Sequence, residues 1–506
     1  MTSLSIIDAP SSNVNGTARA VGTGGLTLVR STSYGNQNVA AGSDTKIGQY
    51  DLTASAYDTI NISAMTVAVN VNTMSLSDLS NLYLKFNGQT TSAKGSVASS
   101  NVFSVNTSLA PGESMTVEVW ATIGTTASSG ESCSTTLAVT ATRATDGGDA
   151  SKSAVTGQTI TIQNGALTVA KASDSPVSAI IVGDTTDELL AKFTFSANYE
   201  AFTVSEIRVS TQSTTTDNFT GVYLKYKDAD GVTITTSPLT FVNGTSTFTG
   251  QTLYVPANDT ADLEVYGNVN AVGAGYADTG DRPTLTLKYA KASSNSSSTY
   301  VVATTTPCNG NQMLLYKTAP TVAISGTTAG TLVNGTNNLY SFTIGANSKG
   351  DVGLKRITFH VAPSMSTSSD TIGSFKFYRG STDITDLVDI REATTSGTDL
   401  TTGNLTSSQS ATSVLVVFNS EEVITEDTSQ TYYLKANVTG VGTVGESIST
   451  YIKDDTSYAS PAAYSVSIGN FVWSDRSALS HSTSTSDWMN GYLVDTLATD
   501  AYTLSK

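Results

Sequence analysis

The hydrophobic positions of the chain repeat one unusual spacing three times. In each copy, four apolar side chains follow one another at steps of two, three and two residues. The three sets are Ile60, Ile62, Met65 and Val67; Phe202, Val204, Ile207 and Val209; and Val352, Leu354, Ile357 and Phe359. A step of two keeps side chains on one face of a β-strand, whereas a step of three requires one extra residue. We therefore predict three equivalent strands, called hub strands below, each with a β-bulge in its middle and its apolar positions in a core.

Similar segments surround each hub strand in the same order. A short apolar segment precedes it (50–52, 193–195 and 342–344), and a segment that combines aromatic residues with lysine follows it (82–86, 222–226 and 375–377). A closing strand with alternating polarity ends each repeat (137–142, 285–289 and 448–452). Seven or eight short strands without a helical period are typical of a β-sandwich. We predict an all-β chain of three tandem immunoglobulin-like β-sandwich domains.

The repeat also predicts the boundaries of these domains. Linkers are expected near 145–149 and 293–298, where Asp, Gly and Ser accumulate. The predicted organisation is an N-terminal extension (1–17), three sandwiches (18–157, 158–312 and 313–464) and a C-terminal tail (465–506). A chain of 506 residues is long enough for three domains of ordinary size.

Composition limits the classes of function. The net charge is −16, and charged residues make up 13% of the chain. Scattered basic residues on an acidic chain argue against nucleic acid as a partner, because phosphates are bound by clustered Lys and Arg. The sequence contains no run of 18 consecutive apolar residues, so we predict no membrane-spanning helix. Residues 1–8 lack the pattern of a signal peptide, so we expect a chain whose export signal has been removed.

Residues suited to catalysis are few. Only two histidines are present, His360 and His481. His360 falls on the side of the third hub strand opposite its apolar positions, which predicts an exposed histidine. His481 lies in the tail near Asp475 and Asp487, where a buried hydrogen-bond network that locks the tail is the favoured interpretation. Cys133 and Cys308 have no metal-site spacing and are expected to be unpaired. The sequence predicts that the protein is not an enzyme.

Two binding sites remain as alternatives. Asp228 and Asp230 begin an Asp-x-Asp-Gly sequence like that of a calcium loop, but the later glutamate is absent, and Asp-Gly also favours a hairpin turn. Calcium is therefore left open as a cofactor. Tyr83, Tyr223 and Tyr226 share one strand pattern and would suit a carbohydrate platform, although such side chains more often fill a core or pair across strands.

The two ends of the chain do not follow the repeat. Residues 4–7 form a strand-like segment ahead of the first domain, and 465–470 parallels 159–164, which leads into the second domain. Phe471–Ser474 would then be the opening strand of a domain that does not follow. Because a free strand can pair with an open sheet edge, a neighbour could accept the N-terminal segment as an added strand, or the tail could cap the third domain or dock on the next subunit. We favour exchange of the N-terminal segment, because the tail carries enough Trp and Tyr to fold back on its own chain. The candidate assembly residues are Leu4, Ile6, Ile7, Phe471, Trp473, Trp488 and Tyr492.

The tail also supplies a resemblance. Its sequence Phe471-Val-Trp-Ser-Asp475, followed by Asp487-Trp-Met-Asn-Gly-Tyr-Leu-Val494, resembles the ending of large secreted surface proteins of candidate-phyla-radiation bacteria, in which it follows tandem immunoglobulin-like domains. The resemblance implies a surface-layer or cell-envelope component and brings no catalytic residues. We therefore expect an extracellular structural protein at the cell surface that assembles with itself into a layer or filament. The alternative is a surface adhesin that binds cell-surface glycan.

Overall fold

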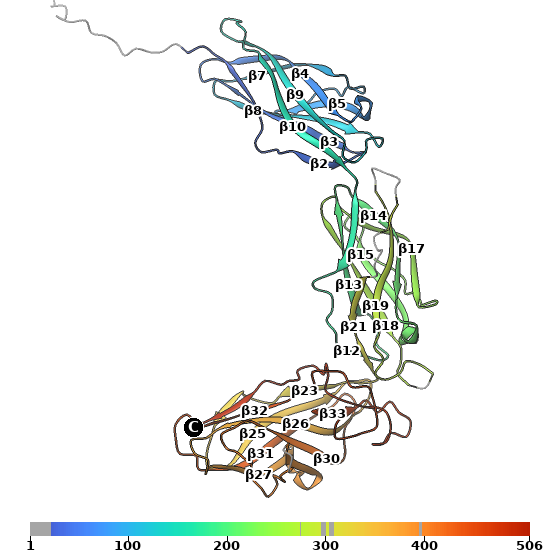
Figure 1. Cartoon of the computed structure of the whole chain (residues 1–506), viewed down its shortest axis with the longest axis vertical. Helices are drawn as coiled ribbons and strands as arrows, with labels where there is room; N and C mark the ends of the chain where they lie inside the picture. Colours follow the sequence, from blue (N-terminus) through green and yellow to red (C-terminus); the bar gives the residue numbers. More distant parts are fainter. Residues whose placement is uncertain (1–21, 274, 295–299, 303–307, 394–396) are drawn as a thin grey trace, which may run out of the picture.

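The fold consists of layered β-sheets in three successive units (Figure 1). The computed structural model describes residues 22–506 except 274, 295–299, 303–307 and 394–396. Its buried hydrophobic residues form three separate clusters, one in each unit. Within the described residues, no helix has the length and apolar character needed to cross a membrane. The predicted all-β fold class is confirmed.

Unit one contains two five-stranded sheets, with a 3-10 helix η1 (Leu76–Asp78) between β4 and β5. The first sheet has the order β1 (Leu26–Arg30), β3 (Asp44–Ala54), β8 (Ser114–Ile123), β5 (Leu79–Phe86), β6 (Gln89–Thr90). The second has the order β2 (Gln37–Ala40), β10 (Lys152–Gln163), β9 (Ser132–Arg143), β4 (Ile60–Asn72), β7 (Ser100–Leu109). The hub strand is β4, which lies between the closing strand β9 and the edge strand β7.

Unit two repeats this topology, with a 3-10 helix η2 (Ser213–Asn218) after its hub strand β14. Its first sheet has the order β11 (Ala166–Lys171), β13 (Glu188–Asn198), β18 (Thr260–Val269), β15 (Phe219–Lys227), β16 (Thr233–Thr235). Its second contains β17 (Thr245–Val255), β14 (Phe202–Ser210), β19 (Thr284–Ser294) and β20 (Tyr300–Val302), with β21 (Cys308–Gln312) also on β19. A separate parallel pair is formed by β12 (Ile180–Val182) and β22 (Leu314–Tyr316).

Unit three has the same first sheet and a larger second sheet, with a 3-10 helix η3 (Thr385–Leu387) before β29. The first has the order β23 (Pro320–Ile324), β25 (Gly335–Ala346), β31 (Ser429–Thr439), β27 (Thr371–Arg379), β28 (Thr382–Asp383). The second has the order β24 (Ala329–Thr331), β35 (Tyr502–Ser505), β32 (Ser447–Ile452), β26 (Val352–Ser364), β30 (Thr412–Ile424), β29 (Val388–Glu392). Two tail strands join it, because β33 (Phe471–Ser474) pairs with β26 and β34 (Trp488–Met489) pairs with β33.

The predicted bulge is present in all three hub strands. We compare each hub strand with one neighbour: β9 for β4, β19 for β14 and β33 for β26. The register shifts by one residue at Ser63, Ser205 and Lys355, respectively. The extra residue lets the apolar positions on both sides of the bulge face the same core. The predicted core positions are at most 2% exposed: Ile60, Ile62, Phe202, Val204, Ile207, Leu354 and Ile357.

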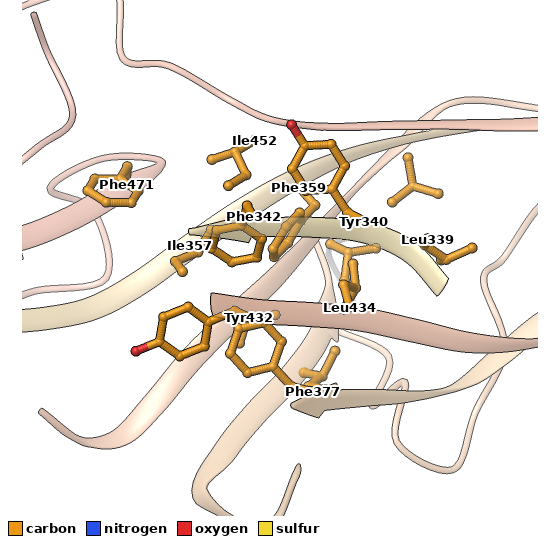
Figure 2. Close-up of a cluster of buried hydrophobic side chains, with 14 of the residues drawn as sticks. Leu339, Tyr340, Phe342, Ile357, Phe359, Phe377, Tyr432, Leu434, Ile452 and Phe471 are labelled. Atoms are coloured by element: carbon orange, nitrogen blue, oxygen red, sulfur yellow. The ribbon is translucent and has the colours of Figure 1, made fainter. Parts of the chain in front are cut away.

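Aromatic rings fill the core of unit three (Figure 2). Phe342 meets the hub residue Phe359 with ring centroids 5.6 Å apart and the planes inclined at 63°. Phe377 stacks on Tyr432 from the neighbouring strand, at 5.6 Å and 12°. These are the tilted and offset arrangements that aromatic pairs prefer, so the two sheets are joined by directional contacts as well as by apolar area.

The linker predicted at 145–149 is wrong, and most of the linker predicted at 293–298 lies outside the described residues. Residues 145–149 form the turn between β9 and β10 inside unit one, where the Arg143 side chain forms an ion pair with Asp146. Ser293 pairs with Tyr300 in the β19–β20 hairpin, and 295–298 lie outside the described residues. The chain instead leaves unit one after β10 and unit two after β22. The reason is that Asp, Gly and Ser are typical of hairpin turns as well as of linkers.

The interpretation of the tail as the start of a missing domain is also wrong. Residues 465–470 are not a strand. β33 instead continues the closing strand β32 along the hub strand, since Ile452 pairs with Phe359 and Phe471 pairs with Ile357. The last strand, β35, pairs antiparallel with β32 and parallel with β24. In unit one, β10 likewise pairs antiparallel with β9 and parallel with β2. The tail therefore belongs to the sheet of unit three.

Candidate functional site: the tail and the junction of units two and three

The parallel pair β12–β22 lies between the cores of units two and three. Side chains alternate along β22, so that successive residues face opposite sides. Met313 and Leu315 belong to the hydrophobic cluster of unit two, whereas Leu314 and Tyr316 belong to that of unit three. All four are at most 3% exposed. One strand buried in two cores restricts the angle between the units.

The tail packs on this junction through Trp473. Its indole ring contacts the Tyr316 ring edge to face, with centroids 5.2 Å apart and the planes at 79°. The indole Nε1–H donates a hydrogen bond of 3.0 Å to the backbone carbonyl of Asn490. A fully buried Trp normally needs such a partner for its N–H group. Trp473 thus joins β33, the later part of the tail and the last strand of unit two.

Asp475, directly after β33, is fully buried and joins three segments. Its Oδ2 accepts hydrogen bonds from the Thr279 hydroxyl of unit two (2.5 Å) and from the Lys317 backbone N–H (2.9 Å). Its Oδ1 accepts bonds from the N–H (3.1 Å) and hydroxyl (2.7 Å) of Ser477. Burial raises the pKa of Asp475, and these hydrogen bonds oppose the shift.

A second contact crosses the junction from residues 453–470, which lie between β32 and β33. The Tyr458 hydroxyl donates a hydrogen bond of 2.9 Å to the backbone carbonyl of Gly280 in unit two. The guanidinium carbon of Arg282 lies 4.6 Å from the centroid of the Tyr458 ring, within the range of a cation–π interaction. Unit two is therefore held by two separate parts of the C-terminal region.

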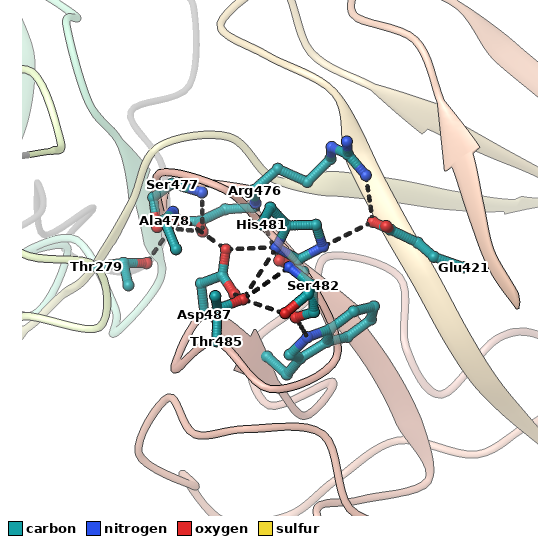
Figure 3. A network of polar contacts seen from close by, with 12 residues as sticks. Thr279, Glu421, Arg476, Ser477, Ala478, His481, Ser482, Thr485 and Asp487 are labelled. Carbon is teal, nitrogen blue, oxygen red and sulfur yellow. Dashed lines mark hydrogen bonds and ion pairs between the residues drawn. The ribbon is translucent and has the colours of Figure 1, made fainter.

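His481 forms the predicted buried network (Figure 3). Its Nδ1 lies 2.7 Å from Asp487 Oδ2, and its Nε2 lies 3.0 Å from Oε1 of Glu421 on β30. Arg476 Nη1 lies 2.6 Å from the same Glu421 oxygen. The side chains of His481 and Asp487 are 6% and 1% exposed. Since a carboxylate engages each imidazole nitrogen, His481 joins the tail at Asp487 to Glu421 of β30.

Several functional contacts could not be identified from the sequence. The tail contacts Glu421 on β30 and Thr279 in unit two, and Tyr458 contacts Gly280 in unit two. The buried Lys355 is the bulge residue of the third hub strand. Lys355 Nζ donates hydrogen bonds to the backbone carbonyls of Phe418 (2.5 Å) and Asn419 (3.0 Å). Burial lowers the pKa of Lys355. The equivalent bulge residues of the other hub strands are Ser63 and Ser205. This difference in residue type is the sequence signal that distinguishes the third bulge.

The predicted assembly residues of the tail lie inside the chain itself. Phe471, Trp473 and Trp488 are fully buried, and the half-buried Tyr492 packs against the core of unit three. The tail folds back on unit three as predicted, which leaves Phe471, Trp473 and Trp488 buried within the chain. A role of these residues in assembly stays a prediction. Leu4, Ile6 and Ile7 lie outside the described residues, so their role in assembly stays a prediction.

Asp228 and Asp230 lie in the hairpin between β15 and β16. Asp228 Oδ1 accepts hydrogen bonds from the backbone N–H groups of Asp230 (3.0 Å) and Val232 (2.9 Å), which is the contact of an Asp-stabilised turn. Among the described residues, no group of three or more His, Cys, Asp or Glu side chains is arranged to hold a metal ion. Binding of calcium stays a prediction.

The three tyrosines do not form one platform. Tyr226 is buried in the core of unit two, 4% exposed. Tyr223 stacks on Tyr266 of the neighbouring strand, with centroids 5.1 Å apart, and Lys225 Nζ lies 4.0 Å from the Tyr266 ring. In unit one, Tyr83 stacks on Trp120 in the same way, and Lys85 Nζ lies 4.0 Å from the Trp120 ring. In unit three, Tyr378 pairs with Tyr433 across the strands, and Lys435 Nζ lies 4.0 Å from the Tyr378 ring. Such cross-strand stacks stabilise the outer face of a sheet.

The remaining candidates are structural. His360 is half-buried and contacts Tyr451, with ring centroids 4.7 Å apart and the planes tilted by 34°, so it is less exposed than predicted. Burial lowers the pKa of His360. Cys133 and Cys308 are both free, as predicted, although only Cys133 is fully buried.

Comparisons with known proteins do not assign the chain to a family. No protein-family model and no curated protein matches the chain. Among solved structures, a membrane-anchored protein from Corynebacterium diphtheriae aligns at 11% identity over 96% of this chain and 91% of its own, with a TM-score of 0.19. The C-terminal domains of the antigen I/II proteins BspA of Streptococcus agalactiae and AspA of Streptococcus pyogenes align in full with 58% and 59% of this chain, at 9% identity and TM-scores of 0.18 and 0.16. TM-scores this low carry no argument, so the fold assignment rests on the sheets themselves.

Proposed function

We propose that the chain is an extracellular structural protein of the cell surface, a subunit that assembles with itself into a layer or filament. The observation that carries this proposal is the fixed junction between units two and three, where β22 is buried in two cores and Asp475 is bonded to both sides. A spacing element needs a defined angle between successive domains. A flexible linker has no such requirement.

The polar groups of the tail also support a structural role. The hydrogen-bonding groups of Asp475 and both ring nitrogens of His481 are used inside the chain. Such saturated networks specify one conformation and leave little capacity for chemistry. The similarity of the tail sequence to endings of secreted surface proteins supports the same proposal.

One observation favours the adhesin as a second candidate function. A hollow of about 420 Å³ on unit two is lined by the stacked rings of Tyr223 and Tyr266, together with Lys225, Asp187 and Asn268. Aromatic rings beside amide, amine and carboxylate groups are the side chains that suit a sugar ring. Tyr223 donates a hydrogen bond of 2.6 Å to Asp187, so part of this polar capacity is already used.

Electron microscopy of the purified full-length chain tests the proposal. We expect ordered sheets or fibres, with calcium and chelator compared at the same protein concentration. A chain that remains monomeric over a wide range of concentration and ionic conditions would contradict the structural function. Binding of that monomer to a glycan array, lost on Tyr223→Ala and retained on Tyr289→Ala, would establish the adhesin instead.

A further inference from the structure

Among the described residues, the edge of the second sheet is covered in unit three but not in unit one. In unit three, β29 pairs antiparallel with β30, and its Val388 and Ile390 are buried. The counterpart of β30 in unit one is β7, because each follows the aromatic-lysine strand and pairs with the hub strand. Within the described part of unit one, β7 pairs with β4 alone and ends the sheet.

The length of the preceding connection explains this difference. In unit three, the chain between β28 and β30 includes η3 and β29, whereas in unit one only residues 91–99 join β6 to β7. That connection is too short to supply a further strand. The edge is also unprotected in its sequence, because β7 (SNVFSVNTSL) contains neither a charged residue nor proline. Long uncharged edges are templates for strand addition.

A groove lies along this edge. It has a volume of about 540 Å³ and is bordered by Val102–Asn106 of β7 and by residues 89–94 of the opposite sheet. Val102 is 55% exposed. Among the described residues, Lys94 is the one charged side chain that lines the groove, and its Nζ lies 5.2 Å from the centroid of the Phe103 ring. The groove therefore offers free backbone groups of an edge strand, apolar side chains and a single cation.

We propose that β7 of unit one accepts the N-terminal segment of a second copy of this chain as an added strand. The segment Leu4-Ser5-Ile6 carries apolar residues at two alternate positions, as Val388-Asp389-Ile390 does in the β29 strand that fills the equivalent place. Asp8, the one charged side chain in residues 1–16, is complementary to Lys94. The inference rests on the proposed function and names its contact surface.

Site-directed disulfide formation tests the contact in the full-length chain. In a background of Cys133→Ala and Cys308→Ser, an Ile6→Cys chain is mixed with a Val102→Cys chain under mild oxidation. We expect a cross-linked dimer in severalfold greater yield than with Val29→Cys, a matched control because Val29 is also exposed and lies on the edge strand β1 of the other sheet. Equal yields for the two partners would overturn the proposal.

The same chemistry distinguishes a second copy from the chain's own N-terminus. A single chain that carries both Ile6→Cys and Val102→Cys is oxidised at high and at low protein concentration. We expect cross-linked dimers and larger species whose yield falls on dilution. A cross-link confined to the monomer at both concentrations would show that the segment completes its own unit one, which contradicts the proposal.

Assembly of charged variants separates this inference from the proposed function. Val102→Lys should abolish ordered arrays, because a charge on the edge opposes strand addition, whereas Val29→Lys should leave them intact. Thermal unfolding of both variants confirms that unit one remains folded. If both variants assemble like the unchanged chain, the edge β7 is not the contact, although the structural function stands. If the unchanged chain itself forms no arrays, the structural function fails, and the cross-linking result alone decides the inference.

Discussion

The carboxylate of Asp475 in the tail accepts a hydrogen bond from the hydroxyl of Thr279 in unit two, although 196 positions separate them in the sequence. The same tail segment supplies β33 to the second sheet of unit three. One stretch of chain therefore completes one domain and fixes its neighbour. Unfolding of the tail should be coupled to both units.

Asp475 should make the stability of the junction depend on pH. Burial raises its pKa above the unfolded value of about 4, so the folded chain holds the proton more tightly. The stability that this group contributes is fully present below its unfolded pKa and is lost as pH rises through the folded pKa. Denaturant unfolding of the full chain and of Asp475→Asn should therefore differ more at pH 4.5 than at pH 8.

The substitution itself should also destabilise the junction. Asp475→Asn places an amide group where the carboxylate accepts bonds from N–H and O–H donors, at a cost of roughly 1–3 kcal/mol. Asp495→Asn is the matched control, because Asp495 is an exposed Asp of the same tail. A pH-independent difference between Asp475→Asn and the unchanged chain would show that the carboxylate does not titrate as argued.

His481→Ala should destabilise unit three strongly. The change leaves Asp487 buried without its imidazole partner and removes a bond from Glu421, and breaking such a buried pair costs about 3–5 kcal/mol. Calorimetry should show a lower unfolding temperature for unit three and no change for unit one. His360→Ala, which loses one ring contact on the outer face of the same unit, is the control and should have a smaller effect. Equal effects of the two substitutions would contradict the network.

The fold could be predicted from local patterns, but the site could not. The steps of two, three and two around residues 60, 202 and 352 are a local consequence of a bulged strand with one buried face, and the structure has a bulge at each. The linker predicted at 145–149 failed because turns inside a sandwich use the same residues. Periodicity reports which side of a strand is buried and carries no information on which domain the strand joins.

The tail shows this limit most clearly. Its aromatic and polar residues indicated a buried network, and His481 does contact Asp487 as expected. The place of β33 in the sheet was misjudged because residues 453–470 separate it from β32. In unit one, the single strand β9 pairs with the hub strand along the equivalent length. Glu421 and Thr279 could not be identified as partners, since their contacts with the tail are set by the arrangement of the units.

Truncation of a hub residue should unfold its own unit alone. Phe202→Ala removes a fully buried ring from the second hub strand and should lower the free energy of unfolding by about 3–5 kcal/mol. Denaturant unfolding of the full chain should show one early transition, assigned to unit two by proteolysis. Thr203→Ala, whose side chain is half-buried on the opposite side of the strand, is the control. A change near zero for Phe202→Ala would mean that the assigned face is wrong.

Divalent ions should affect assembly more than folding. Packing subunits with a net charge of −16 crowds negative charge, which cations relieve. We expect a chelator to disperse arrays while the unfolding temperatures of the units in dilute solution remain unchanged. A fall in any unfolding temperature upon chelation, with recovery on adding calcium, would instead indicate an ion bound within the fold.

Removal of the tail should abolish the folding of unit three. A chain that ends at residue 464 lacks β33 and β35, which leaves the hub strand β26 without its partner at Gly353–Ile357 and β32 without its outer neighbour. It also lacks Trp473 and Trp488, both fully buried. Calorimetry should show the transition of unit three lost and that of unit one retained, and limited proteolysis should cleave unit three. Leu479→Ser, on a side chain that is 85% exposed in the same tail, is the control and should change neither result. A truncated chain that keeps a cooperative transition for unit three would show that the tail is an attachment rather than part of the sheet.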